Sequence, residues 1–502
     1  MRKANETEGG LPHVRCRAGR MATLALAAAL LAGPAQAGAQ ADRAVAAVKQ
    51  LMAERALAPG AVLSLTVKQG NLASFLGENE QLKRDWEAAT GTVIDARVMP
   101  QLASRAFIRQ HGDVDLTIAR SNETPDLADE GLIAPLSPLL ERFGFVLSDA
   151  PPDGYLHVRQ QAEFDGRIMA IPADGDVAML YLRRDLMEDA AQQARFKQRY
   201  GRPLAPPRTW TEYNDLIAFF DRPAEGFRGA LEPRDALTGW MYWMPRYMAF
   251  AAPGQGLFDA DMHPLIDSPA GIAATEAYLA TVAHSPAGVL AEGNDYSFTL
   301  PLFLNGKGFS TILTLAAAKL ANHARSPVLG KVMTVPMPGR GGADAVPRST
   351  LIYGNNLVIP ARSKHQALAF LYAMWLTDPQ VSARSVGVAG GFTDPYRLHH
   401  FDDPRIRQVY GAAAIEVARQ QLPHVAPAGT GLPGDADYLA ALGKHLSLAA
   451  RGLQSAAQAM RETAREWEAM TERRGRATQV AHWTRFRGAY PDAPMKEAAA
   501  PR

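Results

Sequence analysis

The chain has 502 residues, of which 47% are hydrophobic and 21% charged, and its formal net charge is +2. This composition excludes a disordered or fibrous chain, and the length allows two or three ordinary domain cores. Because the basic residues are scattered along the sequence, it carries no electrostatic signature of a nucleic-acid or anionic membrane partner, and we expect a small or neutral one.

The first 41 residues are typical of a secretory signal region. An apolar run at 21–33 is followed by small-residue exits at 35–37 and 39–41, and three basic residues precede it: Arg15, Arg17 and Arg20. A membrane span needs about 20 apolar residues, so this shorter run predicts a cleaved signal. We expect the mature chain to begin near Gly38 or Asp42.

The position of the single cysteine indicates whether the protein carries the lipid anchor of a lipoprotein. Cys16 precedes the apolar run, whereas the acylated cysteine of a lipoprotein would follow it. No later segment is apolar over the length that a membrane span requires. We therefore expect a periplasmic product that has neither a lipid anchor nor a membrane-spanning segment.

The segment from residue 61 to residue 119 alternates strand-like and helical patterns. The runs at 61–70, 91–100 and 113–119 have the composition of buried strands, and residues 75–89 have the apolar spacing of an amphipathic helix. Strand, helix and strand at this spacing predict a βαβ unit, and hence a parallel sheet with a right-handed crossover.

Several helices are marked farther along the chain. Thr209 with Glu212 forms a capping box, and Ser268 and Asp378 each precede a proline that suits the first helical position. Residues 364–376 are apolar on nearly every side and predict a buried helix. Apolar residues near the end recur at the spacing of an amphipathic helix: Leu453, Ala457, Met460, Ala464 and Trp467.

Two short motifs suggest chemistry that their surroundings do not support. The letters GTGLPG at 429–434 fit a dinucleotide-binding loop, but no strand precedes them and no acidic residue closes a βαβ unit downstream. Residues 399–403 contain potential metal ligands, yet they are more typical of a loop that ends in a helix cap: His399, His400, Asp402 and Asp403. We expect no metal and no cofactor.

Two carboxylates, Asp174 and Asp176, flank Gly175 between strand-like runs. Side chains two apart on a strand share a face, so the pair could serve as the acid and nucleophile of a glycosidase, whose carboxylates stand about 5 to 9 Å apart. Gly175 permits a bend that would spoil this register. The same acids could instead accept hydrogen bonds from a bound solute, or act as loop caps. The sequence favours solute binding and leaves the other two roles open.

Aromatic residues cluster at 239–250. At helical spacing Trp240, Trp243 and Tyr247 fall on one face, which is either part of the core or a platform for a sugar ring. Other residues are weaker candidates for solute contact: Tyr296, Tyr353, Asn355 and Arg397.

Five segments, taken in order, carry a family resemblance. They are DVDLTIARSNETPDLADEGLIAPLSPLL at 113–140, DGRIMAIPADGDVAMLYLRRDLMED at 165–189, PRTWTEYNDL at 207–216, FLNGKGFSTI at 303–312 and YGNNLVIPARSKHQALAFLYAMWLTDP at 353–379. Together they resemble the family 1 extracellular solute-binding proteins of bacterial ABC importers, the group that includes maltose-binding protein.

The resemblance implies an α/β fold of the type II periplasmic-binding-protein kind, with two discontinuous lobes joined by hinge crossings. Lobe one would comprise 60–172 and 350–412, lobe two 173–349 and 413–485, and residues 486–502 would form a flexible tail. A monomer would capture a sugar, polyol or similar small solute between the lobes, close over it, and deliver it to the permease subunits of an ABC importer.

The resemblance also implies which residues face the solute. Carried over by position, they are Gly70 and Asn71, Ser121 and Asn122, Asp174 and Asp176, Trp240, and the loop from Tyr353 to Asn355. Members of this family often place a tryptophan after the F-x-x-G segment, but STILTLAAAKL at 310–320 has none. Trp240 or Trp243 would have to compensate. A secreted glycoside-acting enzyme and a ligand sensor for a membrane receptor stay open as alternatives.

Overall fold

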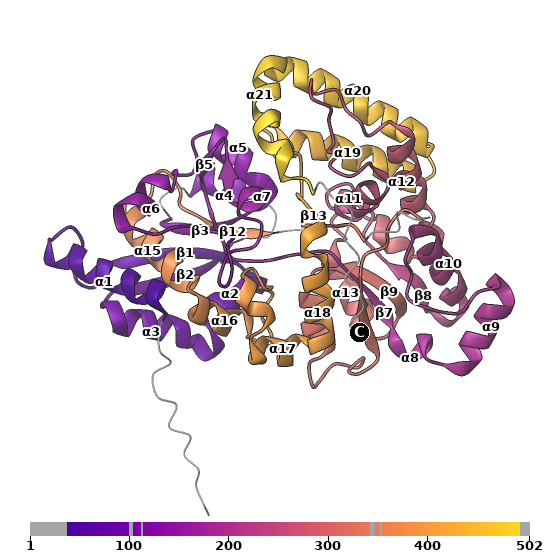
Figure 1. Ribbon diagram of the computed structural model, residues 1–502, viewed down its shortest axis with the longest axis horizontal. Helices are drawn as coiled ribbons and strands as arrows, with labels where there is room; N and C mark the ends of the chain where they lie inside the picture. The colour runs from indigo at the N-terminus through magenta and orange to yellow at the C-terminus, as the bar shows by residue number, and fades with distance from the viewer. Residues whose placement is uncertain (1–37, 100–103, 112–113, 342–346, 352–353, 492–502) are drawn as a thin grey trace, which may run out of the picture. The chain divides into compact units, whose positions relative to one another are not determined.

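The structure is a computed structural model that describes residues 38–99, 104–111, 114–341, 347–351 and 354–491 (Figure 1). The described residues form one compact unit. The predicted signal region comprises residues 1–41, of which 1–37 lie outside the described residues, so the signal and its cleavage stay predictions.

A five-stranded sheet has the strand order β2-β1-β3-β12-β6. Its strands are β1 (Val62–Lys68), β2 (Val93–Met99), β3 (Leu116–Arg120), β6 (Ile171–Pro172) and β12 (Asn355–Val358). β1 is parallel to both β2 and β3, whereas β12 is antiparallel to β3 and β6. The three predicted N-terminal strands and their parallel pairing are confirmed.

The helix predicted at 75–89 is broken in the structure. It is replaced by α2 (Gln69–Leu76) and α3 (Gln81–Thr90), which are separated by a turn in which Asn79 and Glu80 have positive φ. Positive φ interrupts a right-handed helix, and asparagine is one of the few residues other than glycine that adopts it readily. The apolar spacing survives the break because Leu82 and Trp86 of α3 still face the core.

A second sheet has the order β10-β7-β9-β8. Its strands are β7 (Met179–Arg183), β8 (Arg228–Leu231), β9 (Gly308–Leu313) and β10 (Val332–Val335). β7 is antiparallel to both of its neighbours, and β8 is parallel to β9. Residues 173–178 carry the chain from β6 of the first sheet to β7 of the second, and β12 returns it to the first.

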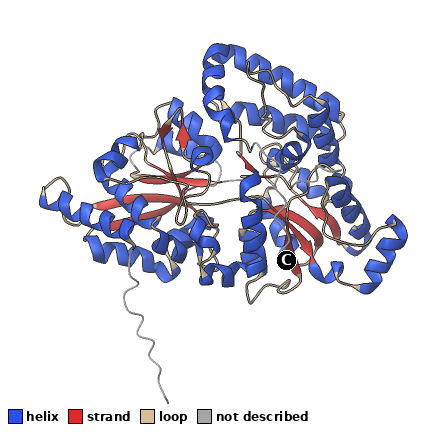
Figure 2. Cartoon of the chain, viewed as in Figure 1, coloured by secondary structure: helices blue, strands red, loops and turns tan. Residues whose placement is uncertain are grey.

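Helices surround the strands of both sheets (Figure 2). Those before β7 are α1 (Ala39–Ala53), α2, α3, α4 (Ser104–Gln110), α5 (Thr124–Asp129), α6 (Ser137–Phe143) and α7 (Val158–Gln161). Those between β7 and β10 are α8 (Arg184–Met187), α9 (Ala190–Tyr200), α10 (Trp210–Phe220), α11 (Gly239–Phe250), α12 (Pro269–Leu279), α13 (Tyr296–Leu304) and α14 (Ala316–Ala321).

The remaining helices follow β12. They are α15 (Gln366–Leu376), α16 (Pro379–Val386), α17 (Pro404–Tyr410), α18 (Ala412–Gln421), α19 (Asp435–Ala450), α20 (Ala456–Arg474) and α21 (Arg476–Phe486). Two small sheets complete the fold, one of β4 (Glu163–Phe164) and β5 (Arg167–Ile168), the other of β11 (Ser349–Thr350) and β13 (Val425–Ala426).

The predicted helix starts are confirmed. The Thr209 hydroxyl accepts from the Glu212 N–H at 3.1 Å at the start of α10, although the Glu212 carboxylate accepts from the Arg208 N–H. Ser268 caps α12, and Asp378 accepts from two N–H groups of α16. The buried helix predicted at 364–376 is α15, whose residues from Leu368 to its end are all buried.

The two ends of the described chain are packed against the core. At the start of α1, the Gln40 amide donates to the Met374 carbonyl and the Ala41 N–H donates to Asp378. Near the other end Tyr490 is buried beside Trp483, although the sequence suggests a tail with little to bury from residue 486. Residues 492–502 lie outside the described residues.

The predicted C-terminal amphipathic helix corresponds to α20. Met460, Ala464 and Trp467 are buried on it, whereas Leu453 precedes the helix and is exposed. The predicted lobe boundaries stay predictions. α17, placed by the resemblance at the end of lobe one, packs on α14 as well as on α16.

Candidate functional site

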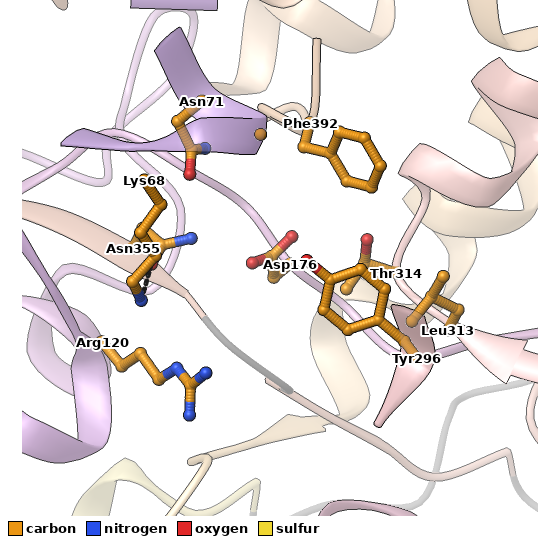
Figure 3. Close-up of a pocket in the computed structure, with 10 residues that line it drawn as sticks. Lys68, Asn71, Arg120, Asp176, Tyr296, Leu313, Thr314, Asn355 and Phe392 are labelled. Atoms are coloured by element: carbon orange, nitrogen blue, oxygen red, sulfur yellow. Dashed lines mark hydrogen bonds between the residues drawn. The ribbon is translucent and has the colours of Figure 1, made fainter. Parts of the chain in front are cut away.

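A cavity with about 520 Å³ of empty space lies where strand ends of the two sheets meet (Figure 3). Its lining residues are Lys68, Gly70, Asn71, Arg120, Asp176, Tyr296, Leu313, Thr314, Asn355 and Phe392. In open α/β sheets, ligand pockets lie at the strand ends.

One wall of the cavity is formed by strand ends of the first sheet. Lys68 ends β1 and Arg120 ends β3, and since these strands are parallel both residues lie at the same edge. Asn355 begins the antiparallel β12 and pairs with Arg120. The Lys68 ammonium donates to Asn355 Oδ1 at 3.0 Å. Asn71, from α2, completes a wall rich in nitrogen donors.

The opposite wall is largely aromatic and aliphatic. Leu313 ends β9 and Thr314 follows it, while Tyr296 is the first residue of α13. The rings of Tyr296 and Phe392 have centroids 6.2 Å apart at 44° to each other. Figure 3 shows Asp176 between the two walls. The cavity therefore offers a polar and an apolar face to one occupant.

Asp174 does not line this cavity but lies behind the donor wall. Its carboxylate is fully buried and accepts from Asn71 Nδ2 at 3.2 Å, Asn355 Nδ2 at 3.1 Å and the Asp394 N–H at 2.7 Å. Burial, and then the charge of Asp394, raise the pKa of Asp174 to about 7. Asp174 thus fixes the orientation of two amides that line the cavity.

Gly175 is required by a close approach of two chain segments. A Cβ built on it would lie 1.8 Å from the carbonyl oxygen of Pro395. The sequence suggests a bend at this glycine, and the structure adds that the segment 173–178 runs directly against residues 394–396. Any side chain larger than hydrogen would push the two segments apart.

Three carboxylates meet beside the cavity, and their oxygens lie within 4.8 Å of one another: Asp174, Asp176 and Asp394. Burial, followed by the charges of Asp174 and Asp394, raises the pKa of Asp176 well above its usual value. The buried Lys319 ammonium supplies positive charge close to Asp394 and donates to three backbone carbonyls: Val386, Gly391 and Thr393. These carboxylate oxygens could accept a cation, and the charges of Lys68 and Lys319 already act on them.

Five of the predicted solute contacts line the cavity: Gly70, Asn71, Asp176, Tyr296 and Asn355. Tyr353 lies outside the described residues. Of the two residues predicted at the end of the third strand, Ser121 is buried with its N–H on the Gly354 carbonyl, and Asn122 donates to Asp435 Oδ2 at 3.1 Å. Neither belongs to the lining.

Trp240 and Trp243 differ from the prediction of a stacking platform. Trp240 Nε1 donates to the Leu237 carbonyl, and Trp243 Nε1 donates to Thr275 Oγ1. Both rings are buried, and that of Trp243 stacks on Tyr247 with centroids 5.0 Å apart. α11 is buried on nearly every side, so its aromatic face is core.

Arg397 also has a structural position away from the cavity. Its guanidinium donates to the Thr377 carbonyl, the Asp153 carbonyl and Gln40 Oε1, and it lies over the Tyr155 ring. It therefore joins α1 to the first sheet's helices.

The rejected motifs have structural roles as well. His400 contacts Ser382 and the Tyr396 N–H, and Asp403 caps α17. The letters GTGLPG at 429–434 form the loop between β13 and α19, so a strand of two residues precedes them, contrary to the prediction from the sequence.

Sequence reasoning missed five lining residues: Lys68, Arg120, Leu313, Thr314 and Phe392. Lys68 and Arg120 had a usable signal, since each is a cation at the end of a buried parallel strand. Thr314 likewise follows the strand-like run GFSTIL. Phe392 lies in a loop with no periodic pattern and had no such signal.

Known proteins resemble the chain in sequence and in fold. Residues 66–383 match a family described as bacterial extracellular solute-binding protein. A probable amino-acid ABC transporter periplasmic-binding protein (y4oP) of Sinorhizobium fredii is 26% identical over 243 residues, which are 48% of this chain and 50% of that protein. The chain thus spans about half the length of this curated relative.

Solved structures show the fold. Maltose-bound MalE3 of T. maritima is 19% identical with a TM-score of 0.66, and the likeness covers 82% of this chain and all of that one. A solute-binding protein of Agrobacterium radiobacter with ribitol (17% identity, TM-score 0.65) covers 82% and 100%, and one of Agrobacterium vitis with D-mannitol (19%, 0.65) covers 82% and 99%. The predicted two-lobe, type II α/β fold is confirmed.

Proposed function

The chain belongs to the family of bacterial extracellular solute-binding proteins, and from that premise we propose that it captures a small polar solute in the cavity between its two sheets. It hands this solute to the permease subunits of an ABC importer and catalyses no reaction. The observation that carries the proposal is the convergence of strand ends from both sheets on one cavity with a polar and an aromatic wall.

The proposed mechanism is hinge closure. The solute contacts Lys68 and Asn355 of the first sheet and Thr314 of the second, so a form that holds both sheets around it binds more tightly than an open one. The segment near 174, where the chain passes from β6 to β7, is tied to the segment near 394 by the hydrogen bond from the Asp394 N–H to Asp174. The permease would recognise the closed form.

Binding is favoured over glycoside hydrolysis. A glycosidase needs two accessible carboxylates that flank one bond. Asp174 is fully buried and its oxygens are occupied by two amides and a backbone N–H, so it cannot reach a substrate bond. Of these two carboxylates, only Asp176 lines the cavity.

The family and the ligands of the solved relatives guide the choice of solute. Those relatives were solved with maltose, ribitol and D-mannitol, and the curated relative is named for amino acids. We propose a carbohydrate, polyol or similarly polar small solute, taken up in the periplasm after a signal region at 1–41 is removed. None of the helices in the described ranges combines the length and apolar composition of a membrane-crossing segment.

Calorimetric titration and thermal unfolding of the chain from Gly38, with sugars, polyols and amino acids, test this function. A true solute at 100 times its Kd should stabilise the fold by about 2.7 kcal/mol. Asn355→Ala should weaken its binding at least tenfold, because it removes a lining amide and a partner of Lys68.

Asn305→Ala is the matched control. This asparagine is exposed at the end of α13, away from the cavity lining, and its replacement should leave affinity unchanged. Equal weakening in both variants, or turnover of chromogenic glycosides that Asp176→Asn abolishes, would contradict the proposal.

A further inference from the structure

A loop after α16, residues 387–394, carries one lining residue of the cavity and lies between elements of the two sheets. On one side the loop is attached to α2. The Phe392 N–H donates to the Gly70 carbonyl at 3.0 Å, and Asn71 Nδ2 donates to the Thr393 hydroxyl at 3.3 Å. Because α2 packs on β1 as well as on α16, this side of the loop belongs with the first sheet.

On its other side the loop is attached to α14, which packs on α13 and on strand β10 of the second sheet. Lys319 of α14 is 1% exposed, and its ammonium donates to three carbonyls: Val386 at 2.9 Å, Gly391 at 2.9 Å and Thr393 at 3.2 Å. The ammonium also lies 4.6 Å from the centre of the Tyr410 ring. All three of its N–H donors are therefore used.

The last residue of the loop strengthens the same attachment. The Asp394 carboxylate accepts from the Ala316 N–H at the start of α14 at 2.9 Å and from the Tyr410 hydroxyl at 3.0 Å. It also places negative charge close to Lys319. A buried ammonium is tolerated when hydrogen-bond acceptors and opposite charge replace its water, and residues 386–394 supply both.

This attachment determines where the aromatic part of the cavity wall lies. Phe392 stands between two acceptors of Lys319, and its ring centroid is 6.2 Å from that of Tyr296, the first residue of α13 (Figure 3). Because the loop is also attached to α2, release from α14 would let Phe392 move with the first sheet while Tyr296 stays with the second. The aromatic surface offered to a solute would then be divided.

We propose that Lys319 is a positioning residue for solute binding: it attaches loop 387–394 to α14 and thereby holds Phe392 beside Tyr296 in the arrangement that binds the solute. Lys319 is not itself among the described lining residues. The inference rests on the proposed function, because it names a residue that sets the affinity of the same cavity from outside it. The apparent affinity should fall with the fraction of molecules in which the loop is attached.

Hydrogen exchange of the chain from Gly38, without any solute, tests the attachment itself. Lys319→Met keeps a long side chain and removes the three donors. Amides of residues 387–394 and of α14 should exchange at least tenfold faster in this variant, whereas those of α20 should be unchanged. Lys307→Met, at an exposed lysine outside the lining, is the matched control and should change neither.

A double-mutant cycle tests whether Lys319 acts on affinity through Phe392. The variants are titrated calorimetrically with maltose, ribitol and D-mannitol. Lys319→Met and Phe392→Ala should each weaken the tightest-binding probe about tenfold, and the combined variant should bind within about threefold of the weaker single variant. Trp243→Phe, a buried change outside the lining, should lower stability and keep the affinity, which separates positioning from a general loss of stability.

If Lys319→Met does not fold, the wild type still decides. None of the α14 residues lines the cavity, yet a saturating probe should slow their amide exchange at least tenfold, because binding favours the attached loop. Unchanged exchange of α14 on saturation would overturn the inference.

The two proposals fail in different ways. A folded Lys319→Met that binds as tightly as the wild type, or losses that multiply in the combined variant, would overturn the role of Lys319 and leave solute binding intact. Binding of none of the three probes would count against the proposed function, and therefore against a role of Lys319 in it, whatever the exchange of the loop shows.

Discussion

Two carboxylates only two residues apart in sequence have different roles in the structure. Asp176 faces the cavity, whereas Asp174 turns away and accepts hydrogen bonds from Asn71, Asn355 and the Asp394 backbone. Alternation along a strand would have put both on one face. The segment is not a strand at this point, and the contact of Gly175 with Pro395 sets its path instead.

Another buried carboxylate, Asp435, gives a pH dependence that can be measured. It accepts from the Thr430 N–H and hydroxyl and from Asn122, and burial raises its pKa from 3.8 to about 7. Between pH 3.8 and about pH 7, the Asp435 carboxyl therefore holds its proton in the folded chain more often than in the unfolded chain. Its contribution to stability is therefore fully present below about pH 4 and is lost as pH rises through about 7.

We expect Asp435→Asn to remove this part of the pH dependence. Denaturant unfolding of wild type and variant between pH 4 and pH 8 measures it: the free energy of unfolding of the wild type should fall more steeply with rising pH than that of the variant. Parallel profiles would show that Asp435 titrates alike in the folded and unfolded chain.

At the scale of elements, α11 explains why an aromatic helix face is core. Arg246 of this helix makes a fully buried ion pair with Glu232 at 2.9 Å and lies over the Trp210 ring. The two arginines at 234 and 246 hold the pKa of Glu232 near 2 despite its burial. A charged residue placed this deeply requires protein on every side of the helix, so no face of α11 is left for a solute.

This assignment predicts opposite effects for two aromatic replacements. Trp243→Phe should lower the free energy of unfolding by about 2 kcal/mol, because it loses a buried hydrogen bond and leaves a small cavity, yet keep solute affinity within twofold. Tyr296→Ala should weaken solute binding about tenfold with little effect on stability, since it removes the aromatic wall. Urea unfolding and calorimetric titration measure both quantities. A loss of solute affinity in Trp243→Phe would instead support the prediction that α11 stacks on the solute.

At the scale of the whole molecule, strands were more predictable than the site. The apolar runs correctly predicted β1, β2 and β3, because a buried strand can be recognised from its local composition. The two-lobe arrangement could be foreseen only through the family resemblance, since pairing of β12 with β3 joins residues more than 200 apart. The break before α3 was missed because its apolar spacing continues across the turn.

The residues that line the cavity were predicted to within one or two positions at strand ends and less well elsewhere. Gly70 and Asn71 were found while Lys68 was not, because a lysine that ends a strand has the same local pattern whether it faces solvent or a cavity. Trp243 was misplaced for a similar reason, since helical spacing gives core and platform the same signature. Phe392 depends on the return path of the chain, which no short segment encodes.

The central claim is that one solute lies between the donor wall and the aromatic wall, and a crystal structure of the chain with its tightest-binding solute tests it most directly. Density for the solute is expected in contact with Lys68 and Asn355 on one side and Tyr296 on the other, with Asp176 between them. A solute bound at any other surface, or one whose only contacts are to a single sheet, would contradict it.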